Sequence, residues 1–221
     1  MKHVKVFGKE VEIECPTEAD LSVVDEVFVD LDYKTLDEAI AGAGTIVDIG
    51  AHIGCFSVYA GVKNPNAKIY AYEPVGRNFE LMKGNLKRNR IRNVVAKNLA
   101  VGAEEGVRKI QLSADSHNHS FVEVQEVVGE DAVNVTTLPA ILRKIGKADV
   151  VKMDCEGAEF EIMKSMGEEN FLDVGTFLIE YHEGIAGRKG ELIEILKQNN
   201  FKVRDFPSHY DKNMGFVFAS K

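Results

Sequence analysis

The chain is poor in several residue types, and each shortage narrows the kind of protein it encodes. Tryptophan is absent, and the 221 residues include only 5 prolines and 3 cysteines. Cys15, Cys55 and Cys155 lie far apart and form no C-x-x-C pair, which argues against a disulfide scaffold. Sparse, unpaired thiols favour a reducing compartment, so a cytoplasmic location is expected.

Long apolar runs and an excess of positive charge are missing as well. No run of 18 apolar residues occurs, so no membrane-spanning helix is expected, and the start of the chain lacks the apolar core of a secretory signal. The 35 acidic residues outnumber the 27 lysines and arginines, which gives a net charge of −8. Binding to nucleic-acid phosphates needs a basic surface, so neither a membrane nor a nucleic acid is the expected partner.

From Thr45 onward the chain repeats one unit, in which a short apolar run is followed by a turn and an amphipathic stretch. Such alternation predicts a single α/β domain with a mainly parallel sheet and helices on both faces. The runs predicted as strands are 45–49, 68–72, 94–101, 149–153, 176–180, 201–203 and 216–219. The patterns predicted as helices are 53–61, 76–89, 138–145, 158–166 and 188–199. The last two strands are expected to form a terminal hairpin.

The first forty residues differ from this repeat. Alternation on either side of Gly8 predicts a β-hairpin, and Thr17 or Asp20 can cap the helix that follows. The chain is therefore divided into an N-terminal extension, residues 1–40, and a main domain, residues 41–221.

The extension is predicted to cover the substrate. It carries Phe28 and Tyr33, and a polar loop at 113–120 is the second segment expected to close over the same pocket. Loops of this kind order on binding in many enzymes.

The segment 45–54 carries the most informative motif. An apolar strand ends with Asp48 and passes through Gly50 into a helix with Gly54 in its first turn. This G-x-x-x-G spacing differs from the G-x-G-x-x-G of a dinucleotide site, whose amides bind a pyrophosphate. S-adenosylmethionine has no phosphate but carries an amino group and a sulfonium, which a carboxylate at the strand end suits better. The candidate cofactor contacts here are Asp48, Gly50, Ala51, His52 and Gly54.

The next predicted strand supports the same cofactor. It ends in Glu73 and Pro74, and Glu73 follows Gly50 by 23 residues. In nucleoside-binding βαβ units an acidic residue about 20 positions beyond the glycine turn accepts hydrogen bonds from ribose hydroxyls. Pro74 ends the strand and keeps that carboxylate at the site. Ala100, near the end of the third strand, is predicted to flank the adenine ring.

Acidic groups gather after the fourth and fifth predicted strands. Asp154 and Glu156 follow the fourth, and Glu180 and His182 end the fifth, so parallel pairing would bring all four to one edge. Methyl transfer to a hydroxyl requires an aligned acceptor and a group that takes its proton. These four residues are the catalytic candidates, with Asp154 also a cofactor contact. His182 is the expected base, because an unperturbed imidazole has a pKa of about 6.5.

Two other interpretations of the four residues stay open, as does the choice of base among them. Their oxygens and imidazole could hold a divalent ion that lowers the pKa of the acceptor, although no metal is expected. Alternatively, Asp154 and Glu156 cap the helix that begins near Gly157.

Together these motifs resemble the FkbM-type family of S-adenosylmethionine-dependent methyltransferases over residues 45–182. The matching pieces are V-D-I-G-A-H-I-G at 47–54, Y-E-P at 72–74, N-L-A-V-G at 98–102, T-T-L at 136–138, V-K-M-D-C-E-G-A-E at 151–159 and I-E-Y-H at 179–182. The resemblance implies a class I methyltransferase fold with a Rossmann-like, seven-stranded sheet whose last strand is antiparallel. It also implies cofactor contacts by Asp48, Gly50 and Glu73, and O-methylation of a hydroxyl on a sugar, polyketide or related small molecule.

Three alternatives share parts of this pattern. An NAD(P)-linked oxidoreductase would share the βα repeat, but its glycine triplet is missing. A nucleic-acid methyltransferase that modifies amino groups would carry an N/D-P-P-aromatic element where this chain has D-C-E-G at 154–157. A non-catalytic binding protein would be expected to have a damaged cofactor loop, and this loop is intact. A small-molecule acceptor is the expected partner, and the pattern sets no oligomeric state.

Overall fold

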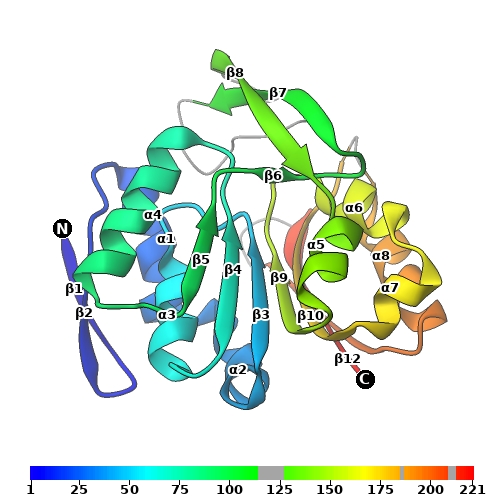
Figure 1. Ribbon diagram of the computed structural model, residues 1–221, viewed down its shortest axis with the longest axis horizontal. Coiled ribbons are helices and arrows are strands. Elements are labelled where there is room, and N and C mark those ends of the chain that lie inside the picture. Colours follow the sequence, from blue (N-terminus) through cyan, green and yellow to red (C-terminus); the bar gives the residue numbers. More distant parts are fainter. Residues whose placement is uncertain (114–126, 185–186, 209–212) are drawn as a thin grey trace.

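The computed structural model describes residues 1–113, 127–184, 187–208 and 213–221. Within these ranges the centre is a seven-stranded sheet, whose strands in spatial order are β11 (Lys202–Pro207), β12 (Met214–Ser220), β10 (Val174–His182), β9 (Ala148–Met153), β3 (Thr45–Ile49), β4 (Lys68–Tyr72) and β5 (Val94–Lys97) (Figure 1). The five strands from β10 to β5 pair in parallel. β12 runs antiparallel to both β10 and β11. The predicted mostly parallel sheet with an antiparallel last strand is confirmed.

Helices cover both faces of this sheet, as predicted (Figure 1). Side chains along a strand alternate between faces, so Ile46 packs with one group of helices and Val47 with the other. The first group is α2 (Asp37–Gly42), α3 (Cys55–Lys63) and α4 (Gly76–Arg88), and the second is α5 (Leu138–Ile145), α6 (Glu159–Ser165), α7 (Glu168–Leu172) and α8 (Lys189–Gln198). All but α2 and α7 match predicted helices. Within the described ranges, no helix is both long and apolar enough to cross a bilayer.

A second, three-stranded sheet corrects part of the strand prediction. The run 94–101, expected as one strand, is broken after β5, and β6 (Ala100–Val101) pairs with β8 (Val127–Thr136), which in turn pairs with β7 (Gly106–Ser113). The break follows from Asn98, whose side-chain amide donates to the carbonyl oxygens of Glu73 and Pro74 at 2.9 and 2.8 Å. These bonds tie the chain to the end of β4 and direct it out of the main sheet. The predicted covering loop at 113–120 lies, from residue 114 on, outside the described residues.

The N-terminal extension begins with the predicted hairpin of β1 (Lys2–Val6) and β2 (Lys9–Ile13), followed by α1 (Glu18–Asp25). Thr17 caps α1: its hydroxyl accepts the Asp20 N–H at 3.0 Å, and the Asp20 carboxylate accepts the Thr17 N–H at 3.0 Å. A π-helical turn, η1 (Glu26–Asp30), and a 3-10 turn, η2 (Asp32–Leu36), then lead into α2.

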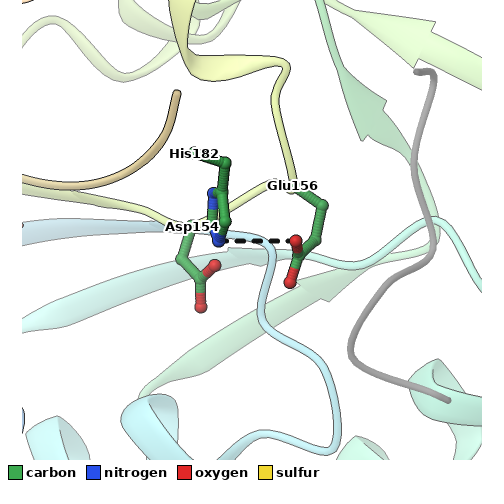
Figure 2. Close-up of side chains that lie close together, drawn as sticks. All are labelled: Asp154, Glu156 and His182. Carbon is green, nitrogen blue, oxygen red and sulfur yellow. Dashed lines mark ion pairs between the residues drawn. The ribbon is translucent and has the colours of Figure 1, made fainter. Parts of the chain in front are cut away.

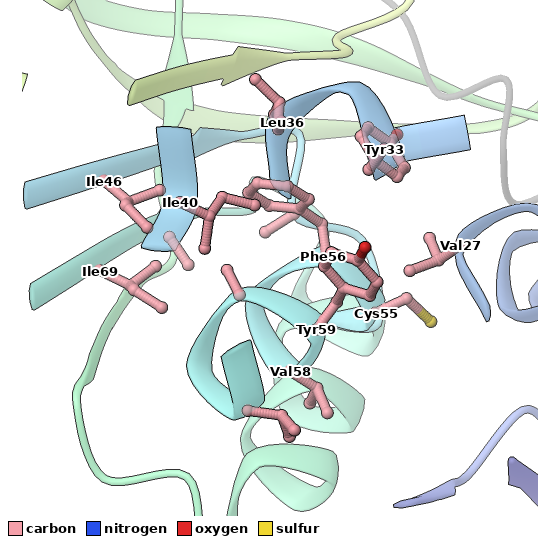
Figure 3. Packing of buried hydrophobic residues seen from close by; sticks show 14 of the residues in the cluster. Val27, Tyr33, Leu36, Ile40, Ile46, Cys55, Phe56, Val58, Tyr59 and Ile69 are labelled. Carbon is pink, nitrogen blue, oxygen red and sulfur yellow. The ribbon is translucent and has the colours of Figure 1, made fainter. Parts of the chain in front are cut away.

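The extension shares a hydrophobic core with the rest of the chain (Figure 3). Val27, Tyr33 and Leu36 are buried against α3, with the rings of Tyr33 and Phe56 5.1 Å apart. α2 runs from Asp37 to Gly42 and so crosses residue 40. The division of the chain at that residue stays a prediction.

Candidate active site

A cavity of about 230 Å³ lies at the carboxyl ends of the parallel strands, where this topology places ligands. Three parts of the molecule line it: the strand ends, the small sheet and the N-terminal extension. The lining used below comprises Gly50, Ala51, His52, Glu73, Pro74, Val75, Lys152, Asp154, Glu156, Glu180, His182 and Met214 from the main domain, Ala100 and Ile110 from the small sheet, and Val23, Val27 and Tyr33 from the extension. All predicted site residues except Asp48 and Gly54 are therefore at the cavity.

The turn after β3 is fixed by backbone contacts on two sides. The N–H groups of Gly50 and Ala51 both donate to the Tyr72 carbonyl oxygen of β4, at 3.1 and 3.0 Å. Gly50 has a φ of +73°, and a Cβ there would lie 1.6 Å from the Asp154 carbonyl oxygen. Glycine is required at this position because the end of β9 passes directly against the turn.

Glu73 is a buried carboxylate held by the backbone. Its Oε2 accepts the N–H of His52 at 2.8 Å, and its Oε1 accepts the N–H of Val75 at 2.9 Å. Burial raises its pKa to about 7, because the two backbone hydrogen bonds offset only part of the desolvation. Each oxygen keeps a lone pair. Glu73 can therefore accept two further hydrogen bonds from a ligand in the cavity.

Asp48 lies behind the cavity. Its Oδ2 accepts the Ser57 hydroxyl at 2.7 Å, and its Oδ1 lies 3.5 Å from the Lys152 Nζ, with the carboxylate fully buried. Lys152 also donates to the Gly50 carbonyl oxygen at 2.8 Å and lies 3.4 Å from Asp154 Oδ2. Direct contact of Asp48 with a cofactor stays a prediction, since in the structure Asp48 reaches the cavity through Lys152.

Lys152 is a buried residue of the cavity lining that the sequence analysis did not single out. Burial alone would lower its pKa, but Asp154 and Asp48 outweigh that effect and raise it, so the ammonium stays charged. The signal was a lysine among the buried apolar residues Val150, Val151 and Met153 of β9, and the pairing of β9 with β3 explains it by placing Lys152 beside Asp48. Gly54, the other residue outside the cavity lining, precedes α3 with a φ of +88° and packs against Met82.

The structure brings three of the four catalytic candidates into one cluster (Figure 2). Nε2 of His182 lies 3.4 Å from Oε2 of Glu156, and one ligand atom from each of Asp154, Glu156 and His182 lies within 4.8 Å of the others. On the other side of the ring, Nδ1 lies 3.3 Å from Oε1 of the fully buried Glu159. Glu180, the fourth candidate, lines the same cavity.

The electrostatics of His182 correct the sequence-based argument for its role. Burial alone would lower its pKa, but the carboxylates of Glu156 and Glu159 outweigh that effect and raise it to about 11. In this state the ring is a cation at neutral pH and has no free nitrogen to accept a proton. The argument used the pKa of an isolated imidazole, which does not apply among carboxylates. The role of His182 as base stays a prediction.

The capping interpretation of the acidic residues is wrong. α6 starts at Glu159, and the residue at its cap position is Ala158, which has no capping side chain. Glu156 instead adopts a left-handed backbone conformation, with a φ of 53°. Such a conformation costs a non-glycine residue about 1 kcal/mol or more and is often found at functional sites.

The extension is joined to the site by Asp20 and Tyr33. The Asp20 carboxylate accepts hydrogen bonds from the Arg77 guanidinium at 2.6 and 3.2 Å and lies 3.6 Å from Nε2 of His52. The Tyr33 ring covers Lys152, whose Nζ is 5.7 Å from the ring centroid. The extension thus forms part of the wall of the cavity.

Comparison with known proteins identifies the family. The sequence model of the family described as "Methyltransferase FkbM domain" matches residues 48–210. The methyltransferase sdnD of Sordaria araneosa is 25% identical over 211 residues, which cover 80% of each chain. The 31-O-demethyl-FK506 methyltransferase FkbM of Streptomyces tacrolimicus is 21% identical over 210 residues, again 80% of each chain.

Solved structures show the same fold at low sequence identity. The magnesium protoporphyrin IX methyltransferase of Synechocystis, solved with bound S-adenosylmethionine, matches with a TM-score of 0.55 at 13% identity, over 92% of this chain and 80% of that one. An rRNA methylase from Streptococcus thermophilus matches with a TM-score of 0.53 at 10% identity, over 86% and 96%. The fold is that of class I S-adenosylmethionine-dependent methyltransferases, and the oxidoreductase alternative is set aside. The chain belongs to the FkbM methyltransferase family, and the enzyme is a methyltransferase.

Proposed function

We propose that this enzyme transfers the methyl group of S-adenosylmethionine to a hydroxyl oxygen of a small molecule. The observation that carries the proposal is Glu73, a buried carboxylate at the end of β4. Two backbone N–H groups hold it from either side, and its remaining lone pairs are available to the cavity. A vicinal pair of ribose hydroxyls provides the two donors that this carboxylate lacks.

The rest of the cavity supports this placement of the cofactor. The cavity lining includes the apolar side chains of Val75, Ala100 and Ile110, which suit an adenine ring. It also includes the Gly50 turn and Asp154, which offer backbone groups and a carboxylate to the amino-acid end and the sulfonium. The methyl group then points toward the cluster of acidic residues and His182.

The acceptor lies between the extension and the end of β10. This side of the cavity combines apolar groups of Val23, Val27 and Met214 with polar groups of Tyr33 and Glu180. Such a mixture suits a small organic molecule with a hydroxyl. Residues from the N-terminal extension and from the start of β12 line this part of the cavity.

In the reaction, the acceptor oxygen attacks the methyl carbon in line with the departing sulfur. The new C–O bond forms as the C–S bond breaks, and the sulfonium becomes a neutral thioether. The acceptor O–H bond also breaks, and its proton passes to the group formed by Asp154, Glu156, Glu180 and His182.

Charge favours a small molecule over a nucleic acid. The chain carries a net charge of −8, which disfavours binding to nucleic-acid phosphates. One relative is named as a methyltransferase of 31-O-demethyl-FK506, whereas the likeness to an rRNA methylase is one of fold alone.

The cofactor assignment is tested by thermal unfolding with and without S-adenosylmethionine. At 100 times the dissociation constant, the cofactor is expected to add about 2.7 kcal/mol of stability, and NAD(P) is expected to add none. The acceptor class is tested by incubation with methyl-labelled cofactor and cell extract separated into RNA and low-molecular-weight fractions. Label in the small-molecule fraction supports the proposal, and label only in RNA contradicts it.

A further inference from the structure

We propose that Asp154, Glu156 and His182 form a binding site for one divalent metal ion beside the acceptor. Only the role of the ion rests on the proposed function, because the binding itself can be measured without cofactor or acceptor. The site would hold the ion where the methyl group and the acceptor hydroxyl meet.

The spacing of the ligand atoms fits one ion. A carboxylate oxygen of Asp154, one of Glu156 and a ring nitrogen of His182 all lie within 4.8 Å of one another. Two ligands on opposite sides of an ion, each about 2.0–2.6 Å from it, are about 4–5 Å apart. The three side chains lie close together (Figure 2).

The orientation of His182 is that of a metal ligand. Its Nδ1 is 3.3 Å from Oε1 of Glu159, and this pairing turns Nε2 toward Glu156. Metal-binding histidines characteristically bond their second nitrogen to a carboxylate or carbonyl oxygen. Glu159 is itself fixed, since it is fully buried and its Oε1 also accepts the Cys155 N–H at 3.0 Å. We therefore assign Glu159 as a positioning residue for the ligand His182.

The charges around the cluster favour a cation. Glu159, which is fully buried and lies 3.3 Å from the His182 ring, adds a third carboxylate to those of Asp154 and Glu156. Lys152, a cation beside Asp154, is already shared between Asp48, Asp154 and the Gly50 carbonyl oxygen. Clustered carboxylates away from water are costly unless a cation compensates them.

The ligand set also indicates the kind of ion and its use. Two carboxylates and one imidazole suit an ion that accepts both oxygen and nitrogen, such as Mn²⁺. Three protein ligands leave coordination positions open for water or for the acceptor hydroxyl. An ion there would polarise the hydroxyl and lower the pKa of its proton.

The test is a titration of the metal-free protein with Mn²⁺, followed by electron paramagnetic resonance of the unbound ion. Wild type is expected to bind one Mn²⁺ per chain. Glu156→Gln and His182→Gln are expected to weaken binding at least tenfold, and Glu159→Gln about 10- to 100-fold through loss of the ring's partner. The matched control is Glu104→Gln, an identical charge change at an exposed position, which is expected to bind Mn²⁺ like wild type.

Two results would overturn the metal site: no Mn²⁺ uptake by wild type, or equal affinity in Glu156→Gln and wild type. Thermal unfolding of each variant without metal checks its fold, and the partly exposed Glu156 keeps the test valid if Glu159→Gln does not fold. Calorimetry with S-adenosylmethionine on the same metal-free protein separates the two proposals. If the protein binds the cofactor but not Mn²⁺, only the proposed metal site is contradicted. If it binds Mn²⁺ but not the cofactor, only the proposed methyl donor is contradicted.

Discussion

The two halves of the cavity are built in different ways. The cofactor half depends on backbone: Gly50 and Ala51 bond to β4, and the N–H groups of His52 and Val75 hold Glu73. The acceptor half depends on side chains from segments far apart in the sequence, from the extension to β10 and the start of β12. A backbone-built site tolerates little change in geometry, whereas a side-chain site can change its chemistry without loss of the fold. Substitutions in the two halves should therefore have separable effects.

The largest effect is expected from Gly50→Ala in the cofactor half. The added Cβ would lie 1.6 Å from the Asp154 carbonyl oxygen at a φ of +73°, so β9 and the turn must separate. We expect a loss of about 4 kcal/mol or more in the free energy of unfolding, measured by urea denaturation. The control is Gly84→Ala inside α4, where a Cβ meets no atom within 4 Å. It should stabilise the protein by up to about 1 kcal/mol, and equal losses in both variants would contradict the account.

In the acceptor half, His182→Ala is expected to lower stability, because it leaves the buried Glu159 without its partner, and to leave cofactor affinity intact. If the ring contacts the reacting atoms, as proposed, turnover should fall by about 10²–10⁴-fold. Turnover is measured with labelled cofactor on the acceptor fraction, and affinity by calorimetry. Unchanged turnover would show that His182 takes no part in the mechanism. A parallel loss of cofactor affinity would show that the two halves of the cavity do not act separately.

Glu73→Gln is the converse substitution. The amide keeps the shape of the side chain but loses the charge and turns an N–H₂ group toward a backbone donor or the ribose. S-adenosylmethionine should bind about 10- to 100-fold more weakly, corresponding to roughly 1.5–3 kcal/mol. Glu156→Gln is the comparison in the acceptor half, and calorimetry without metal should give it a cofactor affinity close to that of wild type. The reverse order of affinities would be incompatible with ribose binding at Glu73.

The smallest effect concerns Asp20, which joins the extension to the cofactor half. Burial alone would raise its pKa, but hydrogen bonds from Arg77 and Thr17 outweigh this and lower the pKa from 3.8 to about 2. A carboxyl group whose pKa is lower in the folded state than in the unfolded state contributes to stability at pH values above the unfolded-state pKa. This contribution is lost as the pH falls through the folded-state pKa. Wild type should lose about 1–2 kcal/mol between about pH 4 and pH 2 through this group. Urea denaturation of Asp20→Asn should show a shallower pH dependence, and identical slopes would exclude this role.

The same contrast explains what the sequence could predict. Gly50 and Glu73 lie in short motifs whose spacing specifies a turn and a strand end, so their positions at the cavity followed from local pattern. The break between β5 and β6 was missed because it depends on Asn98 bonding to the end of β4, a contact between distant residues.

The electrostatics of the acceptor half depend on contacts that no local pattern reveals. Lys152 was missed because its partner Asp48 lies on a neighbouring strand, and only the pairing of β3 with β9 places them together. The raised pKa of His182 similarly depends on Glu156, 3.4 Å from the ring, and on Glu159 of α6, 3.3 Å from it. The sequence could predict which residue types lie in this part of the cavity, but their charge states depend on contacts that only the folded structure shows.

The most direct test of the central claim is a crystal structure of the enzyme with S-adenosylmethionine. The account predicts both ribose hydroxyls within hydrogen-bond distance of the Glu73 carboxylate, the amino-acid end against the Gly50 turn, and the methyl group directed toward His182 and Glu156. A cofactor whose ribose lies away from Glu73, or whose methyl group points away from that cluster, would contradict it.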